Sequence, residues 1–421
     1  MTSDTSIPNP SFFGVWVVRA AFVLAVFGWG VGFYGPPIFL HAVTVRTGWP
    51  LTIVSAAVTL HFLAGVMIIA NLPRLHARFG VAATIVAGAV VTAVGVFGWA
   101  VAAQPWQLFV AALVSGMGWV AMGAVAVNAV VSPWYVRTRP VALAKAYNGA
   151  SIGGVIFAPL WVALMSRHGF THAAVIVGTT MTLVLALLAR FVFARTPASM
   201  HQRPDGEVSA ASTPPAGANS SLTGALLWRD RGFQTLASGM AIGLFAQIGL
   251  LAHLFSLLVP ALGAQAAGAV LGGATACAII GRSAGAQLLM RAGNRRAVAA
   301  ASYAVQALGS LALALVDTGS IGLVLFGVML FGLGIGNATS LPPLIAQSDF
   351  APKDVARVVA PIVAIGQGTY AFAPALFGVV LALSNAVAND GIGPRSVPLF
   401  ILAAGLQLVA AGALLVGRRV P

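Results

Sequence analysis

Residues 82–102 read AATIVAGAVVTAVGVFGWAVA, a run of 21 residues without a charged side chain. A helix of this length crosses a membrane, because the hydrocarbon core is about 30 Å thick and each helical residue rises about 1.5 Å. The whole chain has the same character. Of its 421 residues, 59% are hydrophobic and 7% are charged, whereas soluble domains carry about 25% charged residues. The run therefore predicts a transmembrane helix, and the composition predicts that lipid surrounds much of the chain.

Eleven further runs have similar length and composition. Together the twelve predict an all-α membrane protein, and the 48 glycines agree with close helix packing in lipid. The expected helices lie near 14–40, 52–72, 82–102, 106–131, 143–166, 171–194, 232–259, 266–290, 296–316, 320–346, 354–383 and 396–417.

One long hydrophilic stretch divides the twelve runs into six and six. Residues 195–231 are rich in Pro, Ala, Ser, Gly and Thr, a composition typical of a linker that cannot form a core of its own. We therefore expect two pseudo-symmetric six-helix bundles, at 1–194 and 232–421, joined by a cytoplasmic linker at 195–231.

The positive charges are distributed unevenly between the two sides of this map. Of the 22 Lys and Arg, 18 fall at or near one side, three (Arg46, Arg167 and Arg395) fall on the other, and Arg282 lies inside a helix. The positive-inside rule then predicts that the protein lies in the cell's inner membrane with both termini on the cytoplasmic side. The net charge of +14 is expected to meet anionic lipid headgroups. Basic residues interleaved with aromatics are not found, so nucleic acid is not an expected partner.

The first thirteen residues contain no basic segment of the kind that begins a signal peptide, so we expect no cleaved signal. Cys277 is the only cysteine, which excludes a disulfide within the chain. We expect the protein to function as a monomer.

Two short loops echo each other, one in each half. The first reads PRLHARFG at 73–80, and the second reads AQLLMRAGNRR at 286–296. In each, one residue separates an Arg from a Gly. This pattern resembles the loop after the second helix of the major facilitator superfamily. The resemblance implies a transporter with alternating access, in which Arg78, Gly80, Arg291 and Gly293 belong to gating loops. The family's Asp in this loop, which helps to lock the gate, is replaced by Ala77 and Met290.

Within that superfamily, several segments resemble the branch of monocarboxylate transporters and oxalate/formate antiporters. They occur in the branch's order along the chain. They are GFYGPP at 32–37, GWP at 48–50, WYVRTR at 134–139, the glycine-rich stretch at 149–159, GR at 281–282 and GQG at 366–368.

Arg282 is the sharpest candidate for a binding residue. It lies about eight residues before the end of the predicted helix 266–290, roughly 12 Å deep. A buried Arg normally faces a cavity or another helix, although a long side chain can also extend back to the interface. We favour the cavity. In the resembling branch, the Arg of this helix binds the substrate carboxylate.

Other polar side chains within the helices are further candidates, each with a structural alternative. His61 and His253 could carry a proton or donate to substrate, or could join neighbouring helices as neutral side chains. Tyr34 precedes Gly35-Pro36-Pro37, which should break its helix; it could touch substrate or belong to an interfacial aromatic belt. The last two candidates, on one helical face near mid-membrane, are Gln367 and Tyr370.

The sequence lacks the residue patterns that proton relay, phosphate binding, metal binding and catalysis require. All eight Asp and Glu fall in termini, loops or helix ends, so a buried carboxylate relay is not expected. A phosphate-binding Gly-x-x-x-x-Gly-Lys loop, a metal-ligand cluster and a catalytic set are not found either. We therefore expect no enzyme activity, no cofactor and no metal.

Together these features predict a secondary active or exchange transporter for a small organic anion, such as a monocarboxylate, in symport or antiport. An isolated Arg would form a charge-assisted pair with a carboxylate. The alternative is an exporter of drugs or other amphipathic compounds.

Overall fold

The computed structural model describes residues 12–69, 71–205, 224–292, 294–316, 320–351, 354–384 and 391–417. This part of the chain is almost wholly helical. Its first half contains α1 (Gly14–Gly32), α2 (Gly35–Thr47), α3 (Leu51–Ile69), α4 (Leu72–Phe79), α5 (Val81–Val101), α6 (Pro105–Val120), α7 (Ala124–Val131) and α8 (Arg139–Leu188). Its second half contains α9 (Gly224–Arg229), α10 (Arg231–Leu262), α11 (Ala264–Ala292), α12 (Arg295–Ala314), α13 (Ile321–Asp349), α14 (Val355–Tyr370), α15 (Ala373–Leu383) and α16 (Val397–Val416).

The described helices make twelve membrane spans. Eleven helical stretches are long and apolar enough to cross a membrane, and one of them, Arg139–Phe193, has 55 residues. That length is about 80 Å, more than twice the hydrocarbon core. Gly169 breaks this stretch with φ 76° and ψ 164°, a left-handed backbone that glycine adopts without strain. The break falls between the predicted helices 143–166 and 171–194 and confirms that they are two spans.

The first span is longer than predicted. The predicted helix ended at residue 40, but α1 and α2 together run from Gly14 to Thr47. The predicted break is present, since α1 ends at Gly32 and α2 begins at Gly35 with prolines in its first turn. Proline is tolerated there because the first turn of a helix has no amide partner to lose. The break therefore lies in the middle of the span and not near its end.

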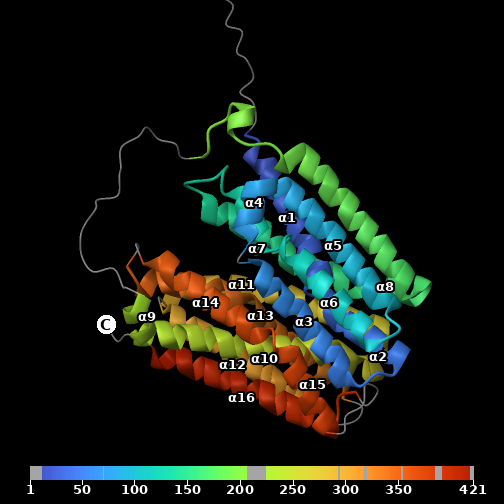
Figure 1. Ribbon diagram of the computed structural model, residues 1–421. Coiled ribbons are helices and arrows are strands. Elements are labelled where there is room, and N and C mark those ends of the chain that lie inside the picture. The colour runs from blue at the N-terminus through green and yellow to red at the C-terminus, as the bar shows by residue number, and fades with distance from the viewer. Residues whose placement is uncertain are drawn as a thin grey trace, which may run out of the picture.

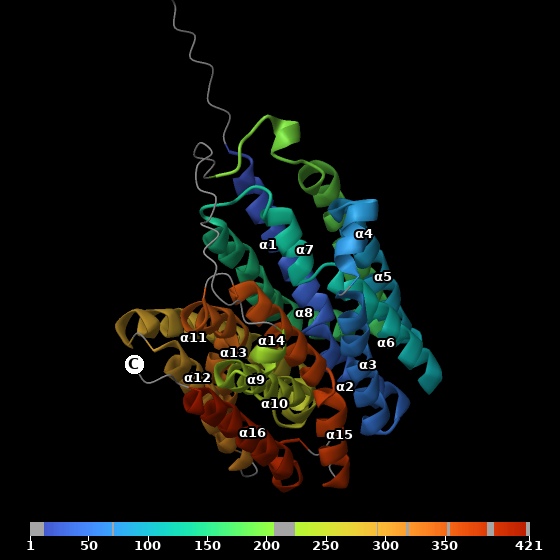
Figure 2. The ribbon, with the colours of Figure 1, turned by 60° about the vertical axis from the view of Figure 1, so that its left-hand side comes forward.

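Figures 1 and 2 show the two bundles from two directions, with α1–α8 in one body and α10–α16 in the other. We call the end that holds α4 and α9 the linker end, and the end that holds the turns at Gly48, Gly169 and Gly263 the far end. The boundaries predicted for the linker, 195–231, include 206–223, which lie outside the described residues.

The hydrogen bonds and ring contacts that join the two bundles, among described residues, lie between mid-span and the far end. Two of them connect α3 with the broken span α14–α15. The Ala375 amide donates to Thr59 Oγ1 over 3.0 Å, and the rings of Phe62 and Tyr370 meet edge to face at 5.7 Å. Nearer the far end, the ring of His41 meets Phe255 at 5.3 Å. The ribbons diverge toward the linker end in both views, so the bundles are closed at the far end.

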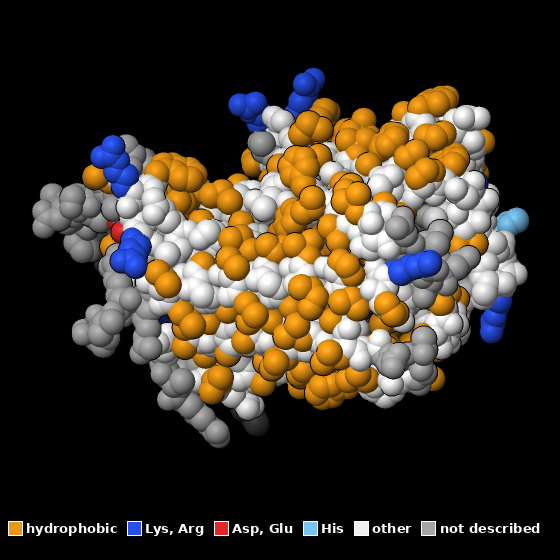
Figure 3. All heavy atoms as spheres, turned by 90° about the horizontal axis from the view of Figure 1, so that it is seen from below, with side chains coloured by type: hydrophobic (Ala, Val, Ile, Leu, Met, Phe, Trp, Pro, Cys, Tyr) orange, Lys and Arg blue, Asp and Glu red, His pale blue; other side chains and the backbone are white. Residues whose placement is uncertain are grey.

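The surface of the second bundle is suited to lipid. Figure 3, seen from below Figure 1, shows hydrophobic side chains across the middle of this face, with the Lys and Arg side chains toward its edges. Large apolar side chains such as Phe326, Leu408 and Val409 are more than half exposed. An apolar surface of this extent is expected only where lipid covers it.

The segment after α8 is bound to the first bundle. The Asp205 carboxylate accepts hydrogen bonds from the Val136 and Thr138 amides and from the Thr138 hydroxyl. Desolvation raises the pKa of the Asp205 carboxyl, but hydrogen bonds from Thr138, Val136 and Arg137 outweigh it and leave the pKa below its ordinary value. The chain is therefore fixed to the loop before α8 as far as residue 205.

A buried ion pair holds the linker end of the second bundle together. Arg296 of α12 is 4% exposed, and its Nε lies 2.6 Å from Asp349 Oδ2 at the end of α13. Its other nitrogens donate to Gly232 O at 2.7 Å, to Thr235 Oγ1 at 3.0 Å and to Leu414 O at 3.5 Å. One guanidinium thus connects α10, α12, α13 and α16.

Candidate functional site

Arg282 lies at mid-span where the two bundles meet. It is half-buried on α11, and its Nε donates to Gly336 O of α13 over 3.1 Å. Its Nη2 makes a long contact of 3.5 Å with Ser151 Oγ of α8, in the other bundle. The one ion pair among described residues does not include Arg282. A guanidinium has five N–H groups, so three are left for a ligand.

Backbone contact between α11 and α13 fixes the position of Arg282. Gly281 lies directly against the carbonyl of Leu333, and Gly336 lies against the carbonyl of Ala278. A side chain at either glycine would separate the two helices, because small residues are what allow this approach. The Arg282 side chain therefore projects from a rigid helix pair toward α8.

Tyr34 occupies the break between α1 and α2 and faces the same place. Its side chain is 5% exposed. A Cβ atom at Gly154 of α8 would lie 2.7 Å from the Tyr34 ring and 2.8 Å from Thr275 of α11. The ring thus lies on bare backbone between the bundles, close enough to Arg282 for the positive charge of the guanidinium to act on the Tyr34 hydroxyl. Tyr34 and Arg282 are brought together, as substrate-binding residues would have to be.

A row of aromatic rings leads from Tyr34 to Tyr370. Phe33 contacts Tyr34 at 5.0 Å and Phe62 at 6.0 Å, and Phe62 contacts Tyr370 at 5.7 Å. Gln367 is half-exposed one turn before Tyr370 on α14, on the helical side that faces the first bundle. Tyr34, Arg282, Tyr370 and Gln367 therefore border the meeting place of the bundles.

His61 lies inside the first bundle, behind this row. It is 2% exposed and stacks on Trp119 at 5.5 Å. Both ring nitrogens are engaged, Nδ1 with Ser115 Oγ and Nε2 with Gly32 O, each at 2.8 Å. Gly32 is the last residue of α1, so His61 satisfies a carbonyl that the helix break releases. This is the contact of a side chain that joins neighbouring helices.

His253 is fully buried on α10, toward the far end. Its Nε2 lies 3.0 Å from Pro374 O in the first turn of α15. Its Nδ1 makes no hydrogen bond with the described residues. The structure therefore places it beside the far-end contact between α3 and α15, away from Arg282.

The predicted gating loops are only partly described. Arg78 is exposed at the end of α4, with its guanidinium 5.2 Å from the Phe79 ring. Gly80 follows with φ 82°, which ends α4 and turns the chain into α5. Arg291 is helical, in the last turn of α11, and Gly293 lies outside the described residues.

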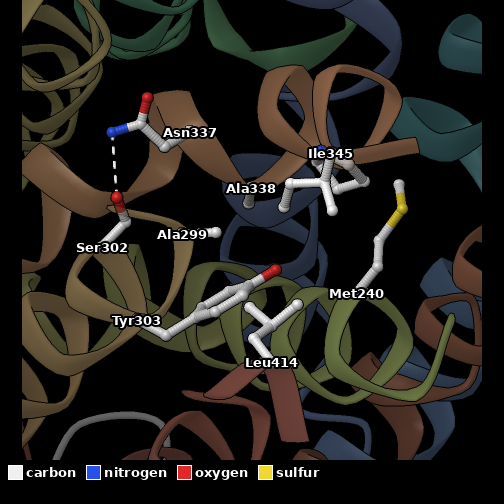
Figure 4. Close-up of a pocket in the computed structure, with 9 residues that line it drawn as sticks. Met240, Ala299, Ser302, Tyr303, Asn337, Ala338, Ile345 and Leu414 are labelled. Carbon is white, nitrogen blue, oxygen red and sulfur yellow. Dashed lines mark hydrogen bonds between the residues drawn. The ribbon is translucent and has the colours of Figure 1, made fainter. Parts of the chain in front are cut away.

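Two cavities lie elsewhere, and Arg282 lines neither. One, of about 530 Å³, lies between α1 and the start of α8. The other, of about 10 Å³, lies inside the second bundle and has room for one water molecule. Figure 4 shows the Tyr303 hydroxyl and Asn337 at its walls. Asn337 Nδ2 donates to Gly281 O and Ser302 Oγ, so Asn337 joins α11, α12 and α13.

Sequence reasoning missed two parts of this arrangement. Ser151 was a weak signal, a single small polar residue within the glycine-rich stretch of α8, and only the fold places it opposite Arg282. The Arg296–Asp349 pair could have been found more easily from the sequence. Arg296 lies at the start of one helix and Asp349 at the end of the next, so the two opposite charges are expected at the same end of the bundle.

Comparison with known proteins agrees with the fold. A model of the Major Facilitator Superfamily matches residues 20–374. Among solved structures, a mutant of the nucleoside transporter NupG has a TM-score of 0.72 at 14% identity, over 96% of this chain and 100% of that one. A bacterial homolog of the human lysosomal transporter Spinster, in an inward-facing and occupied conformation, has a TM-score of 0.67 at 16% identity, over 98% and 97%. No curated protein matches the sequence.

Proposed function

The chain belongs to the major facilitator superfamily, and we propose that it is a secondary transporter whose substrate is a small organic anion of the monocarboxylate type. Transport in this family works by alternating access, in which two helical bundles move about a site near mid-membrane. The proposed substrate-binding residues are Arg282, Tyr34, Gln367 and Tyr370, which border that place. We also propose that residues 195–231 form the linker between two six-helix bundles and that the protein functions as a monomer.

The observation that carries the proposal is the unpaired guanidinium of Arg282. Three of its N–H groups have no partner among the described residues, and no described acidic side chain pairs with it. Removing such a charge from water is unfavourable unless an anion accompanies it. A carboxylate supplies both the charge and two parallel acceptors.

The aromatic row supports a substrate with an apolar body. The rings of Phe33, Phe62 and Tyr370 continue from Tyr34 through successive ring contacts. Stacking and edge contacts with such rings favour planar or branched apolar groups. With no carboxylate in the middle of a spanning helix, we propose exchange, or symport in which the acid carries the proton.

A screen of matched ligand pairs tests the charge requirement. The purified protein is heated with organic acids and, separately, with the corresponding primary amides. A ligand that binds the folded state raises the unfolding temperature. We expect an acid to do so and its amide to have no effect. Stabilisation by amides or by neutral amphipathic compounds to the same extent would contradict the anion proposal and favour the drug exporter.

The membrane orientation is a second proposal, with the linker end in the cytoplasm. Its support is the excess of Lys and Arg at that end. Cysteines at Ser199 and Ser166, which are exposed at opposite ends, are introduced into a Cys277→Ser background. An impermeant thiol reagent added outside intact cells should label the Ser166→Cys variant and spare the Ser199→Cys variant. Labelling of the Ser199→Cys variant alone would reverse the orientation.

Closure of the far end can be tested at Thr59. In Thr59→Val the Ala375 amide loses its acceptor and stays buried while the bundles are closed, but it reaches water when they open. A net hydrogen bond is worth about 1 kcal/mol, so we expect the far-open population to rise about fivefold. The measurement is the labelling rate, from the far side, of a cysteine at Ser55. Ser55 is fully buried and packs on Gly378 of the other bundle.

The matched control for this experiment is Thr44→Val. Thr44 is also a buried threonine near the far end, but its hydroxyl bonds, among the described residues, to Leu40 O in its own helix and not to the other bundle. This variant should label at the wild-type rate. Equal acceleration in both variants would mean that the Thr59–Ala375 bond does not hold the bundles closed.

A further inference from the structure

The larger cavity is a groove that opens between α1 and the start of α8. The two helices touch at Gly149 and Gly153, where a Cβ at Gly153 would lie 2.5 Å from the carbonyl of Val26. They separate from there toward the linker end, leaving about 530 Å³. This volume is in the range of ordinary ligand sites. The groove exists because small residues permit close contact at one end and bulkier residues prevent it at the other.

The walls of the groove are apolar, and two cations stand at its rim. Val18 and Phe22 of α1 face Val141 and Ala142 of α8. Val15 and Val141 are 45% and 57% exposed, so the groove is open at the surface of the described structure.

Arg19 and Lys145 are the two cations, one on each wall. Neither forms an ion pair among the described residues. The Arg19 guanidinium lies 4.9 Å from the ring of Trp16, which is 54% exposed. Among the described residues, the acid of this region is Asp205, which bonds to Thr138 on the groove wall, and its carboxylate already accepts three hydrogen bonds.

The depth of the cations matches a lipid headgroup. The first span has 34 residues and is therefore about 50 Å long, some 20 Å longer than the hydrocarbon core. About 10 Å at each end thus lies among headgroups. Arg19 is five residues, or about 8 Å, from the start of α1, and Phe22 lies one turn deeper. The exposed Trp16 agrees with an interfacial position.

We propose that this groove binds an anionic phospholipid of the linker-side leaflet. The phosphate lies between Arg19 and Lys145, and the first part of an acyl chain lies along Phe22, Val141 and Ala142. The bound lipid connects α1 with α8, the helix that also contacts α11 of the other bundle. This inference does not depend on the identity of the transported solute.

The test compares full-length protein in vesicles of phosphatidylcholine alone and in vesicles that also contain phosphatidylglycerol. Retained lipid is counted by native mass spectrometry after transfer to detergent. We expect the wild-type protein to retain phosphatidylglycerol in preference to phosphatidylcholine. The double variant Arg19→Gln/Lys145→Gln should lose this preference by roughly tenfold or more, as expected when hydrogen bonds from charged groups to the phosphate are lost.

Two further variants separate the groove from the rest of the basic end. Arg74→Gln/Arg78→Gln removes two exposed charges from α4, outside the groove, and should retain the preference. Ala142→Phe fills the groove without changing charge and should lose the lipid. Equal loss in the α4 variant would overturn the proposal in favour of general surface attraction. Retention in the Ala142→Phe variant would overturn it as well.

An experiment with inorganic phosphate tests whether the groove binds a lipid or a free anion. Because the proposal requires the acyl chain, phosphate alone should not displace the retained phosphatidylglycerol or stabilise the protein. Displacement by phosphate, lost in the Arg19→Gln/Lys145→Gln variant, would identify a free-anion site and overturn the lipid assignment. Thermal unfolding of each variant in lipid-free detergent shows whether it is folded, and a wild-type unfolding temperature is expected for the charge variants because both side chains are at the surface.

Discussion

Arg282→Ala is expected to abolish transport of the anionic substrate while leaving the protein folded. Removing one partner of a hydrogen-bonded charge pair in a binding site costs about 2–5 kcal/mol, which lowers affinity by about 30-fold or more. The fold should survive because the change removes a half-buried charge. The Gly336 carbonyl that loses Arg282 still accepts from Ser340 Oγ at 3.0 Å. The measurements are uptake into proteoliposomes and ligand-induced thermal stabilisation.

Two control variants make this result specific. Arg282→Lys keeps the positive charge but loses the planar fork, so it should retain weakened transport. Arg74→Ala removes an exposed cation of α4 whose one side-chain hydrogen bond to a described residue is to Asn71, and it should transport normally. If the Arg282→Ala variant bound an organic acid with wild-type affinity, Arg282 would not be the anion-binding residue. A substrate found to be neutral would remove the reason for assigning it.

Asp349→Ala is expected to destabilise the second bundle strongly. It leaves the Arg296 guanidinium, which is 4% exposed, without its counter-charge. Breaking a buried ion pair from one side costs about 3–5 kcal/mol, and the partial exposure of Asp349 places this case near the lower limit. We expect a clearly lower unfolding temperature for the purified protein, without a direct effect on Arg282, which lies on another helix, α11, and does not contact the pair.

The double variant Asp349→Leu/Arg296→Met separates loss of the pair from loss of packing. With both charges replaced by apolar side chains, no unpaired charge remains, and such replacements are often neutral. Most of the lost stability should therefore return. A double variant as unstable as Asp349→Ala would show that the hydrogen bonds of Arg296 to Gly232 and Thr235 matter more than its charge pairing.

The spans could be predicted because each is an uninterrupted apolar run, and lipid leaves a chain few alternatives to the helix. The end of the first span could not. Beyond Pro37 the helix α2 contains His41, Thr44 and Arg46, which lower its mean hydropathy although the helix continues. Arg46 is accommodated because its Nη2 donates to the carbonyls of Trp99 and Ala102, a contact that no local pattern predicts.

The candidate site was also predictable only in part, because some of its features belong to a single helix and others depend on contacts between helices. The depth of Arg282 follows from its position in one helix, and the break at Tyr34 follows from two prolines. The nearness of Arg282 to Ser151 and Tyr34 follows from packing between bundles, which periodicity within a helix cannot reveal. The sequence could not decide whether His61 carries a proton, contacts substrate or joins two helices. A His within an apolar helix is surrounded by the same kinds of residue in the sequence whether its ring bonds to Gly32 O or to a ligand.

The bond between Asp205 and the loop before α8 has a mechanical consequence. Because these hydrogen bonds fix the chain as far as residue 205, this segment moves with the first bundle when the two bundles rock. The covalent connection to the second bundle is left to the 18 residues between Asp205 and Gly224, a length of chain that can span at most about 60 Å. Among the described residues, the contacts that rocking has to break therefore include the far-end bond between Thr59 and Ala375.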